Sequence, residues 1–183
     1  MPRTASAEVV WTSRWIRLGG AAALLGGLAW TVKGLVILVG GDQPPLLFET
    51  APVMFGAGLL SVAYSTMPPS RRRNAAIGLG VASALAGLAA LVSELVGEVA
   101  GVALATSSLT LMAGLLTLTR RGTWPAPLAW WVGLAMLPAL VVGGMLSELD
   151  ERLLEIPLIC LGLAWLVVGW AAALHPRAVS SAA

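Results

Sequence analysis

Charged and helix-breaking residues divide the chain into six apolar stretches. The stretches cover approximately residues 18–39, 46–67, 75–96, 99–119, 128–146 and 153–174. A helix of about 20 apolar residues crosses the hydrocarbon core of a bilayer, which is about 30 Å thick. Only a few residues around Gly97 separate the third stretch from the fourth, which predicts a tight turn there. We therefore predict an all-α, polytopic membrane bundle of six transmembrane helices in three hairpins.

The two ends of the chain are more polar than its middle. Residues 1–17 carry three arginines and would place Trp11 and Trp15 on one side of a helix, a pattern typical of a segment at the membrane surface. The apolar run behind this segment is too long for the core of a signal peptide, so we expect an uncleaved first span. Residues 175–183 form a short tail, which leaves 18–174 as the transmembrane domain.

The composition supports a membrane protein. Of the 183 residues, 58% are hydrophobic and only 11% are charged, whereas soluble domains carry about 25% charged residues. Lys33 is the single lysine, and the other basic residues are arginines. Together with the many alanines, glycines and leucines, this usage is typical of a bacterial genome rich in G and C. We expect a multi-pass protein of a bacterial plasma membrane.

Basic and acidic residues alternate along the chain in a way that predicts orientation. Nine of the eleven basic residues fall at the chain ends or in the loops after the second and fourth spans, namely Arg3, Arg14, Arg17, Arg71, Arg72, Arg73, Arg120, Arg121 and Arg177. Loops rich in arginine stay in the cytosol. We therefore predict that the N-terminus and the C-terminus are both cytosolic, and that the acidic turns between paired spans face outward.

The third predicted span combines small residues with two carboxylates. Gly78, Ala82, Ala86 and Ala90 recur at every fourth position and lead to Glu94. Such a stripe lets a neighbouring helix approach closely, within this chain or in a homo- or hetero-oligomer. We expect close packing to bury Glu94, with Glu98 at the turn one helical turn away. The alternative is that both carboxylates are simply solvated.

Lys33 lies about 16 residues beyond the arginine that precedes the first span, which places it one or two turns below the outer surface. Glu49 enters the second span at a similar depth, so we predict an ion pair between Lys33 and Glu49. Lys33 extending to the outer headgroups is the alternative. Glu155, just inside the sixth span, is a further candidate carboxylate.

Two tryptophans, Trp30 and Trp165, fall deeper in their spans than the rest of the tryptophans. They could form the wall of an apolar pocket for a lipid or another apolar ligand. Packing within the bundle is the simpler interpretation for both.

The sequence lacks the residues that several classes of function require. One histidine and one cysteine, Cys160, exclude a bis-histidine haem, a cysteine cluster and an intramolecular disulfide within this chain. No phosphate-binding loop, dinucleotide fingerprint, serine nucleophile motif or CxxC pair is present. We expect no cofactor, no metal and no nucleic-acid partner.

Our leading functional hypothesis is a small carrier, or a membrane-embedded binding subunit of a transport system. Its site would open outward among the first, second, third and sixth spans, lined by Lys33, Glu49, Glu94, Glu98, Glu155, Trp30 and Trp165. The first alternative is a membrane-embedded enzyme acting on a lipid or isoprenoid, with Glu49 or Glu94 as general acid or base. The second alternative is a structural subunit of a membrane complex.

Overall fold

The computed structural model describes residues 4–42, 44, 46–97 and 101–174, with side chains from residue 13 onward. This part of the chain is helical and contains no strand. The elements are α1 (Thr4–Leu38), α2 (Leu47–Thr66), α3 (Arg71–Leu95), α4 (Gly101–Leu116), α5 (Ala126–Ser147), the short 3-10 helix η1 (Glu151–Leu154) and α6 (Glu155–Leu174). The predicted all-α class is confirmed. Five helices are long and apolar enough to cross a membrane: Ser13–Leu38 within α1, α2, α3, α5, and Glu151–Leu174, which joins η1 to α6.

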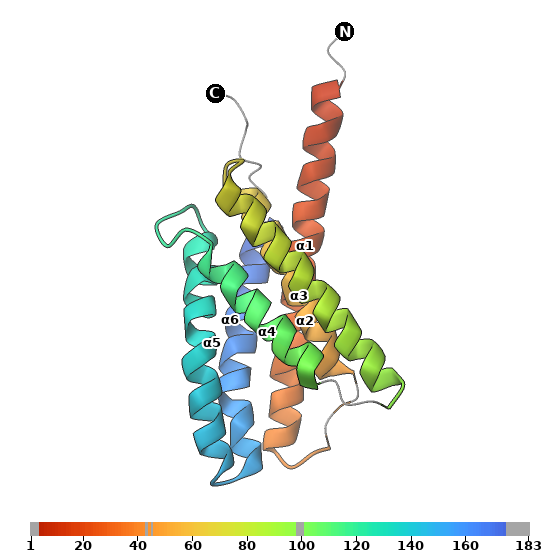
Figure 1. Cartoon of the computed structure of the whole chain (residues 1–183), viewed down its shortest axis with the longest axis vertical. Helices are drawn as coiled ribbons and strands as arrows, with labels where there is room; N and C mark the ends of the chain where they lie inside the picture. The colour runs from red at the N-terminus through yellow and green to blue at the C-terminus, as the bar shows by residue number, and fades with distance from the viewer. Residues whose placement is uncertain (1–3, 43, 45, 98–100, 175–183) are drawn as a thin grey trace.

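The helices run along one common direction, and the loops collect at its two ends (Figure 1). The start of α1 lies at the same end as the α2–α3 and α4–α5 loops, and α1 projects beyond the other helices there. We call this end the basic end, because it carries Arg71, Arg72 and Arg73 at the start of α3 and Arg120 and Arg121 in the α4–α5 loop. The opposite end, with the α1–α2, α3–α4 and α5–η1 turns, is the acidic end.

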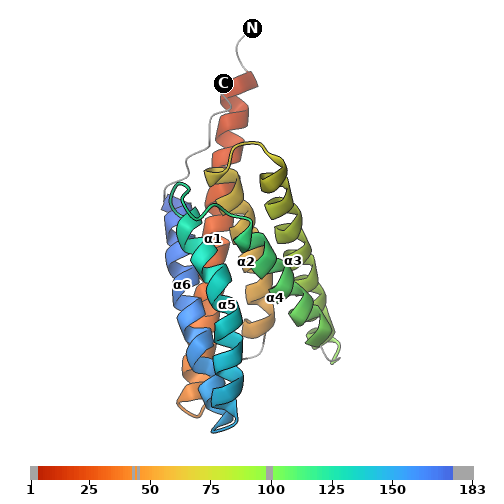
Figure 2. The same cartoon turned by 60° about the vertical axis from the view of Figure 1, so that its left-hand side comes forward.

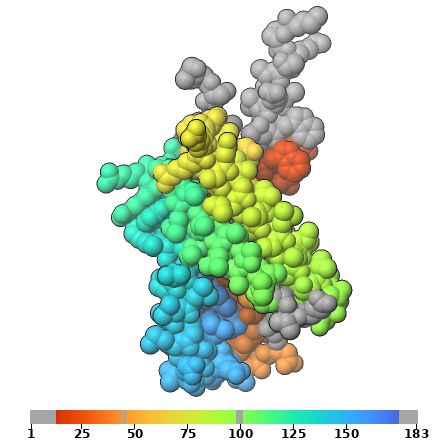
Figure 3. Space-filling view, viewed as in Figure 1, coloured from red at the N-terminus to blue at the C-terminus, as the bar shows by residue number. Residues whose placement is uncertain are grey.

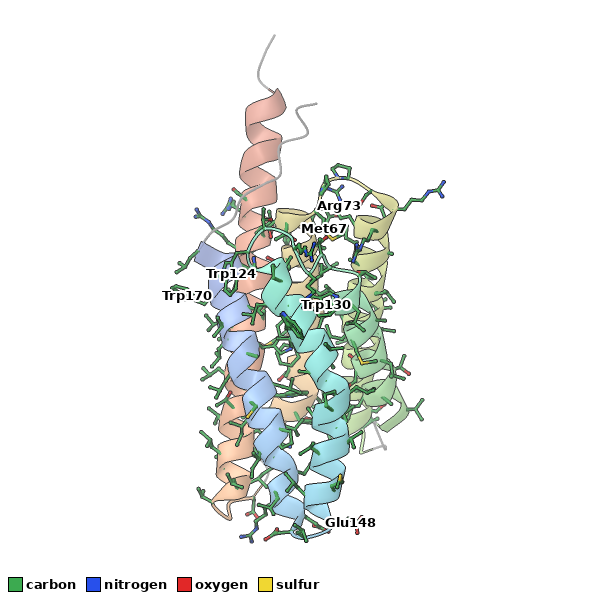
Figure 4. The ribbon with its side chains drawn as sticks, turned by 90° about the vertical axis from the view of Figure 1, so that its left-hand side faces the viewer. Met67, Arg73, Trp124, Trp130, Glu148 and Trp170 are labelled. Carbon is green, nitrogen blue, oxygen red and sulfur yellow. The ribbon has the colours of Figure 1, made fainter. Side chains whose placement is uncertain are left out.

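Three of the tryptophans lie near the basic end, together with an arginine. Arg73, Trp124, Trp130 and Trp170 lie there, whereas Glu148 lies at the acidic end (Figure 4). Trp124 and Trp170 are about half exposed. Indole rings with one apolar and one polar edge favour the headgroup region of a bilayer.

The first and last helices form the most extensive contact of the bundle. Glycines make this approach close, because Gly27 on α1 meets the backbone of Gly162 on α6. A Cβ atom at Gly27 would lie 2.6 Å from the Gly162 carbonyl oxygen, and one at Gly169 would lie 2.3 Å from the Leu24 nitrogen. Small residues allow membrane helices to pack backbone against backbone in this way.

Helix α2 lies at the centre of the bundle, in contact with every other α-helix. Phe55, Leu59 and Val62 on this helix are almost fully buried. Ser61 donates a hydrogen bond of 2.6 Å to the Ile16 carbonyl oxygen of α1. In hydrocarbon, such interhelical hydrogen bonds supplement close packing.

Helices α3 and α4 lie side by side and are inclined to the other helices (Figures 1 and 2). Two buried serines join them: Ser83 and Ser107 exchange side-chain hydrogen bonds with each other's carbonyl oxygens, at 3.1 and 2.8 Å. In the space-filling view these two helices cover much of the facing side of the molecule (Figure 3).

The small-residue face of α3 differs from the predicted one. Gly78 is exposed, and a Cβ atom there would meet nothing within 4 Å. The buried positions are Ala76, Gly80, Ser83, Gly87 and Ala90, of which the predicted stripe contained only the last. Because α3 has small residues on several faces, the positions of α2 and α4 decide which face is buried.

The described part of the fourth helix has 16 residues, Gly101–Leu116, and ends a few residues before the predicted end of the fourth span. The first residues of that predicted span lie outside the described residues. Directly after the helix, Arg72 donates hydrogen bonds to the Thr117 and Leu118 carbonyl oxygens. A cation is favourable near the partial negative charge of a helix C-terminus, so Arg72 stabilises this end of α4.

Candidate functional site

A buried ion pair at the acidic end joins the first and last helices. Lys33 on α1 donates a hydrogen bond of 2.7 Å from Nζ to Oε1 of Glu155, the first residue of α6. Both side chains are only 6% exposed. A pair this deeply buried loses the hydration of both charges, so its geometry has to compensate for that loss.

The glycine contacts between α1 and α6 bring the two charges together. Gly34 follows Lys33 and faces the first turn of α6, where a Cβ atom would lie 2.5 Å from Ile159 Cγ1. The same Cβ atom would lie 3.4 Å from Glu155 Oε2. A larger residue at this position would therefore push α6, and with it the carboxylate, away from Lys33.

An aromatic ring covers the ammonium group. Lys33 Nζ lies 4.6 Å from the centroid of the Phe48 ring at the start of α2. Phe48 stacks on Trp30 with a centroid distance of 5.8 Å, and Trp30 Nε1 donates a 3.4 Å hydrogen bond to the Phe48 carbonyl oxygen. A cation over an aromatic face gains electrostatic attraction, and this gain increases when water is excluded.

The two deep tryptophans belong to one row of rings. Trp30 meets the edge of Phe55 at 5.1 Å, and Phe55 stacks on Trp165 at 4.6 Å. Trp165 is 1% exposed. The rings therefore fill the space between α1, α2 and α6. They pack next to the ion pair and do not line an open pocket. Phe48 and Phe55 are the only two phenylalanines of the chain. Their rarity is the sequence feature that could have identified them as members of this cluster.

A second carboxylate, Glu49, is buried next to Phe48 and is 4% exposed. Its Oε2 atom has no hydrogen-bond partner, and neither has Oε2 of Glu155. Each of the two buried carboxylates thus has one unsatisfied oxygen. A buried carboxylate oxygen without a donor is costly, so a proton or a ligand with N–H or O–H donors would stabilise it. We refer to Lys33, Glu49 and Glu155, the buried charged side chains of the described residues, as the charged centre.

The structure corrects two predictions about these residues. Lys33 pairs with Glu155 and not with Glu49, because α6, and not α2, presents a carboxylate to its Nζ atom. The expected burial of Glu94 is also wrong, because the last turn of α3 is exposed. Glu98 lies outside the described residues.

Two grooves of the described part have walls without Lys33, Glu49 or Glu155. One, of about 520 Å³, runs between α5 and α6 and includes Pro138, Pro157 and Cys160. The other, of about 570 Å³, runs between α1 and α2 near the basic end and includes Trp15, Ser61 and Tyr64. The lining of neither groove includes a carboxylate.

Among the described residues, no group of three or more His, Cys, Asp or Glu side chains has the arrangement of a metal site. The free carboxylate oxygens of the charged centre lack hydrogen-bond donors. They therefore suit an ammonium group, a guanidinium group or a proton. Comparisons with protein-family models, with curated proteins and with solved structures found no match.

Proposed function

We propose that this protein is a small membrane carrier, or the membrane-embedded binding subunit of a transport system, in a bacterial plasma membrane. The charged centre would hold its cargo or a coupling proton. In this proposal the chain crosses the membrane six times in three hairpins. The basic end and both termini are cytosolic, because arginine-rich loops are retained there. The acidic end, and with it the charged centre, then belongs to the outer half of the membrane.

The observation that supports this proposal best is the unequal number of charges. Charged side chains within membrane helices are costly and usually mark an ion or substrate path. A purely structural pair would need one carboxylate for one ammonium, whereas the described residues bury a further carboxylate, Glu49, that makes no ion pair. Its closed state, with all three side chains buried, fits an occluded conformation of a carrier.

The enzyme alternative has less support. An enzyme acting on an apolar substrate needs a cavity with its acid or base facing the reacting bond. Both grooves of the described residues are apolar, and no carboxylate is part of their walls. Glu94, the other candidate base, is exposed at the end of α3.

The proposal can be tested by proton flux into liposomes. The purified full-length protein would be reconstituted with a pH-sensitive dye inside, and a potassium gradient with valinomycin would drive protons inward. We expect uptake above empty liposomes, and we expect Glu49→Gln to abolish it because the amide cannot release a proton. Glu148→Gln, which changes an exposed acid at the same end, is the matched control and should keep the wild-type rate.

If the protein carries its cargo without a coupled proton, the proton-flux assay would not detect transport, so cation binding is measured separately. Guanidinium and ethylammonium chloride would be compared with potassium chloride for protection against thermal unfolding. If the charged centre binds such cations, the midpoint should rise in the wild type and in Glu148→Gln, and not in Glu49→Gln. Absence of both proton uptake and cation protection, or equal results for the two variants, would contradict the carrier proposal and favour a structural subunit.

A further inference from the structure

The groove between α1 and α2 lies at the opposite end from the charged centre and has a different chemistry. Its wall is formed by Trp15, Ile16, Leu18, Gly19, Ala57, Leu60, Ser61 and Tyr64. Trp15 is 66% exposed and Tyr64 is 43% exposed, so the groove opens outward along the helix pair. Its volume of about 570 Å³ lies within the range of small-ligand sites. Apart from Ser61 and Tyr64, its residues are apolar or aromatic.

The single polar side chain in the interior of this groove is already engaged. Ser61 is 3% exposed and donates its hydroxyl to the Ile16 carbonyl oxygen at 2.6 Å. The deep part of the groove therefore offers no free hydrogen-bonding side chain to a polar ligand. An acyl chain needs none, because burial of its methylene groups supplies the free energy.

A cation lies against Tyr64, one of the groove residues. Arg73, in the first turn of α3, places its Cζ atom 5.4 Å from the centroid of the Tyr64 ring. Its Nε atom is buried and has no hydrogen-bond partner. A buried donor without an acceptor is unusual in proteins. The acceptor that suits a guanidinium best is a phosphate or carboxylate oxygen, through a short charge-assisted hydrogen bond.

The surroundings of Arg73 favour an anion of the membrane surface. Arg71 and Arg72 precede it in the same first turn of α3, and Figure 4 shows Arg73 at the basic end of the bundle. Basic pockets between transmembrane helices bind the headgroups of anionic lipids. Tyrosine and tryptophan are enriched at this depth for the same reason, since their rings meet both chain and headgroup.

From these observations we propose that the α1–α2 groove is a binding site for one anionic phospholipid. An acyl chain lies along Leu18, Ala57 and Leu60, the glycerol region meets Tyr64, and the phosphate accepts hydrogen bonds from the Arg73 guanidinium beside that ring. The site does not depend on the charged centre, nor on which side of the membrane the basic end occupies.

Lipid binding can be measured on the purified full-length protein by native mass spectrometry and by thermal unfolding. Phosphatidylglycerol should add one lipid mass and raise the unfolding midpoint, whereas phosphatidylcholine with the same acyl chains should do so at least about tenfold less readily. Arg73→Gln should weaken phosphatidylglycerol binding about tenfold, the equivalent of a lost hydrogen bond to a charged group. Arg71→Gln removes an equal charge from an exposed position of the same helix turn and should bind as the wild type does.

Two further arms make the test specific. Arg73→Lys keeps the charge but has no Nε donor, so its affinity should fall between those of the wild type and Arg73→Gln; it also serves if the glutamine variant fails to fold. Glycerol phosphate, which has the headgroup chemistry without a chain, should give no shift at concentrations where the lipid does. Equal binding by Arg73→Gln and Arg71→Gln, equal affinity for phosphatidylcholine, or a full shift with glycerol phosphate alone would overturn the proposal.

Discussion

Lys33 is the residue whose environment is best explained by its neighbours. Its ammonium group lies 2.7 Å from Glu155 Oε1 and 4.6 Å from the centroid of the Phe48 ring. The residue as a whole is 5% exposed. A lysine so close to the end of a span could extend to the headgroups, as considered above. The acid at the start of α6 offers a nearer partner, and the surrounding rings exclude the water that would otherwise compete for the charge.

A double-mutant cycle would measure the coupling between Lys33 and Glu155. Lys33→Met leaves a buried carboxylate without its donor and should lower the free energy of unfolding by about 1–3 kcal/mol. Adding Glu155→Gln should recover part of this loss, because the stranded charge is then removed. Membrane polar contacts are worth about 0.6 kcal/mol on average, so the coupling energy itself can be modest.

The control for this cycle is the pairing that the sequence predicted. Lys33→Met combined with Glu49→Gln should show less coupling than Lys33→Met with Glu155→Gln, since Glu49 makes no ion pair with Lys33. Unfolding would be followed in detergent micelles by circular dichroism. A larger recovery with Glu49→Gln would show that the partner of Lys33 has been misassigned.

Among the helices, the pairing of α1 with α6 governs how the charged centre is built. Glycines recur at seven-residue intervals on α1, at Gly20, Gly27 and Gly34, and on α6, at Gly162 and Gly169. Each of them faces the backbone or a side chain of the partner helix at a distance that leaves no room for a Cβ atom. A seven-residue repeat keeps one face of each helix toward its neighbour over several turns.

Alanine substitutions would separate close packing from helix propensity. Gly27→Ala would place a methyl group 2.6 Å from the Gly162 carbonyl oxygen, so we expect a loss of about 1–3 kcal/mol from overpacking. Gly78→Ala on α3 meets nothing within 4 Å and should be neutral or stabilise by up to about 1 kcal/mol. Thermal unfolding midpoints of the two variants give the comparison. Similar midpoints would mean that α1 and α6 are not in close contact.

At the scale of the whole molecule, the charges are separated between two ends. The arginine-rich loops lie at one end of the bundle, and the acidic turns lie at the other (Figures 1 and 4). The structure therefore agrees with a chain that reverses direction at each loop. By the positive-inside rule, we expect the arginine-rich end to face the cytosol.

Cysteine labelling of intact cells would test the orientation. In a background in which Cys160 is replaced by serine, an impermeant thiol reagent should modify cysteines in the acidic turns, placed by Asp42→Cys, Gly97→Cys or Asp150→Cys. It should not modify cysteines in the basic loops, placed by Ser70→Cys or Gly122→Cys. The opposite labelling pattern would place the charged centre in the inner half of the membrane.

The sequence alone determined the helical class, the approximate positions of the spans and the separation of acids from arginines. These features depend on local properties: the length of an apolar run, the residues that interrupt it, and the sign of the charge in each loop. The C-terminal limit of α4 was not among them. The apolar run continues to Thr119, but the helix ends at Leu116, just before the carbonyl groups that Arg72 binds.

Only the tertiary structure decided which side chains meet. Lys33 and Glu155 are 122 residues apart, and their contact depends on the order and rotation of the helices in the bundle. Hydrophobic periodicity carries little of this information in a membrane helix, because lipid-facing and buried positions are both apolar. The same reason explains Glu94 and the face of α3: small residues were present on several sides, and the neighbouring helices selected which of them became buried.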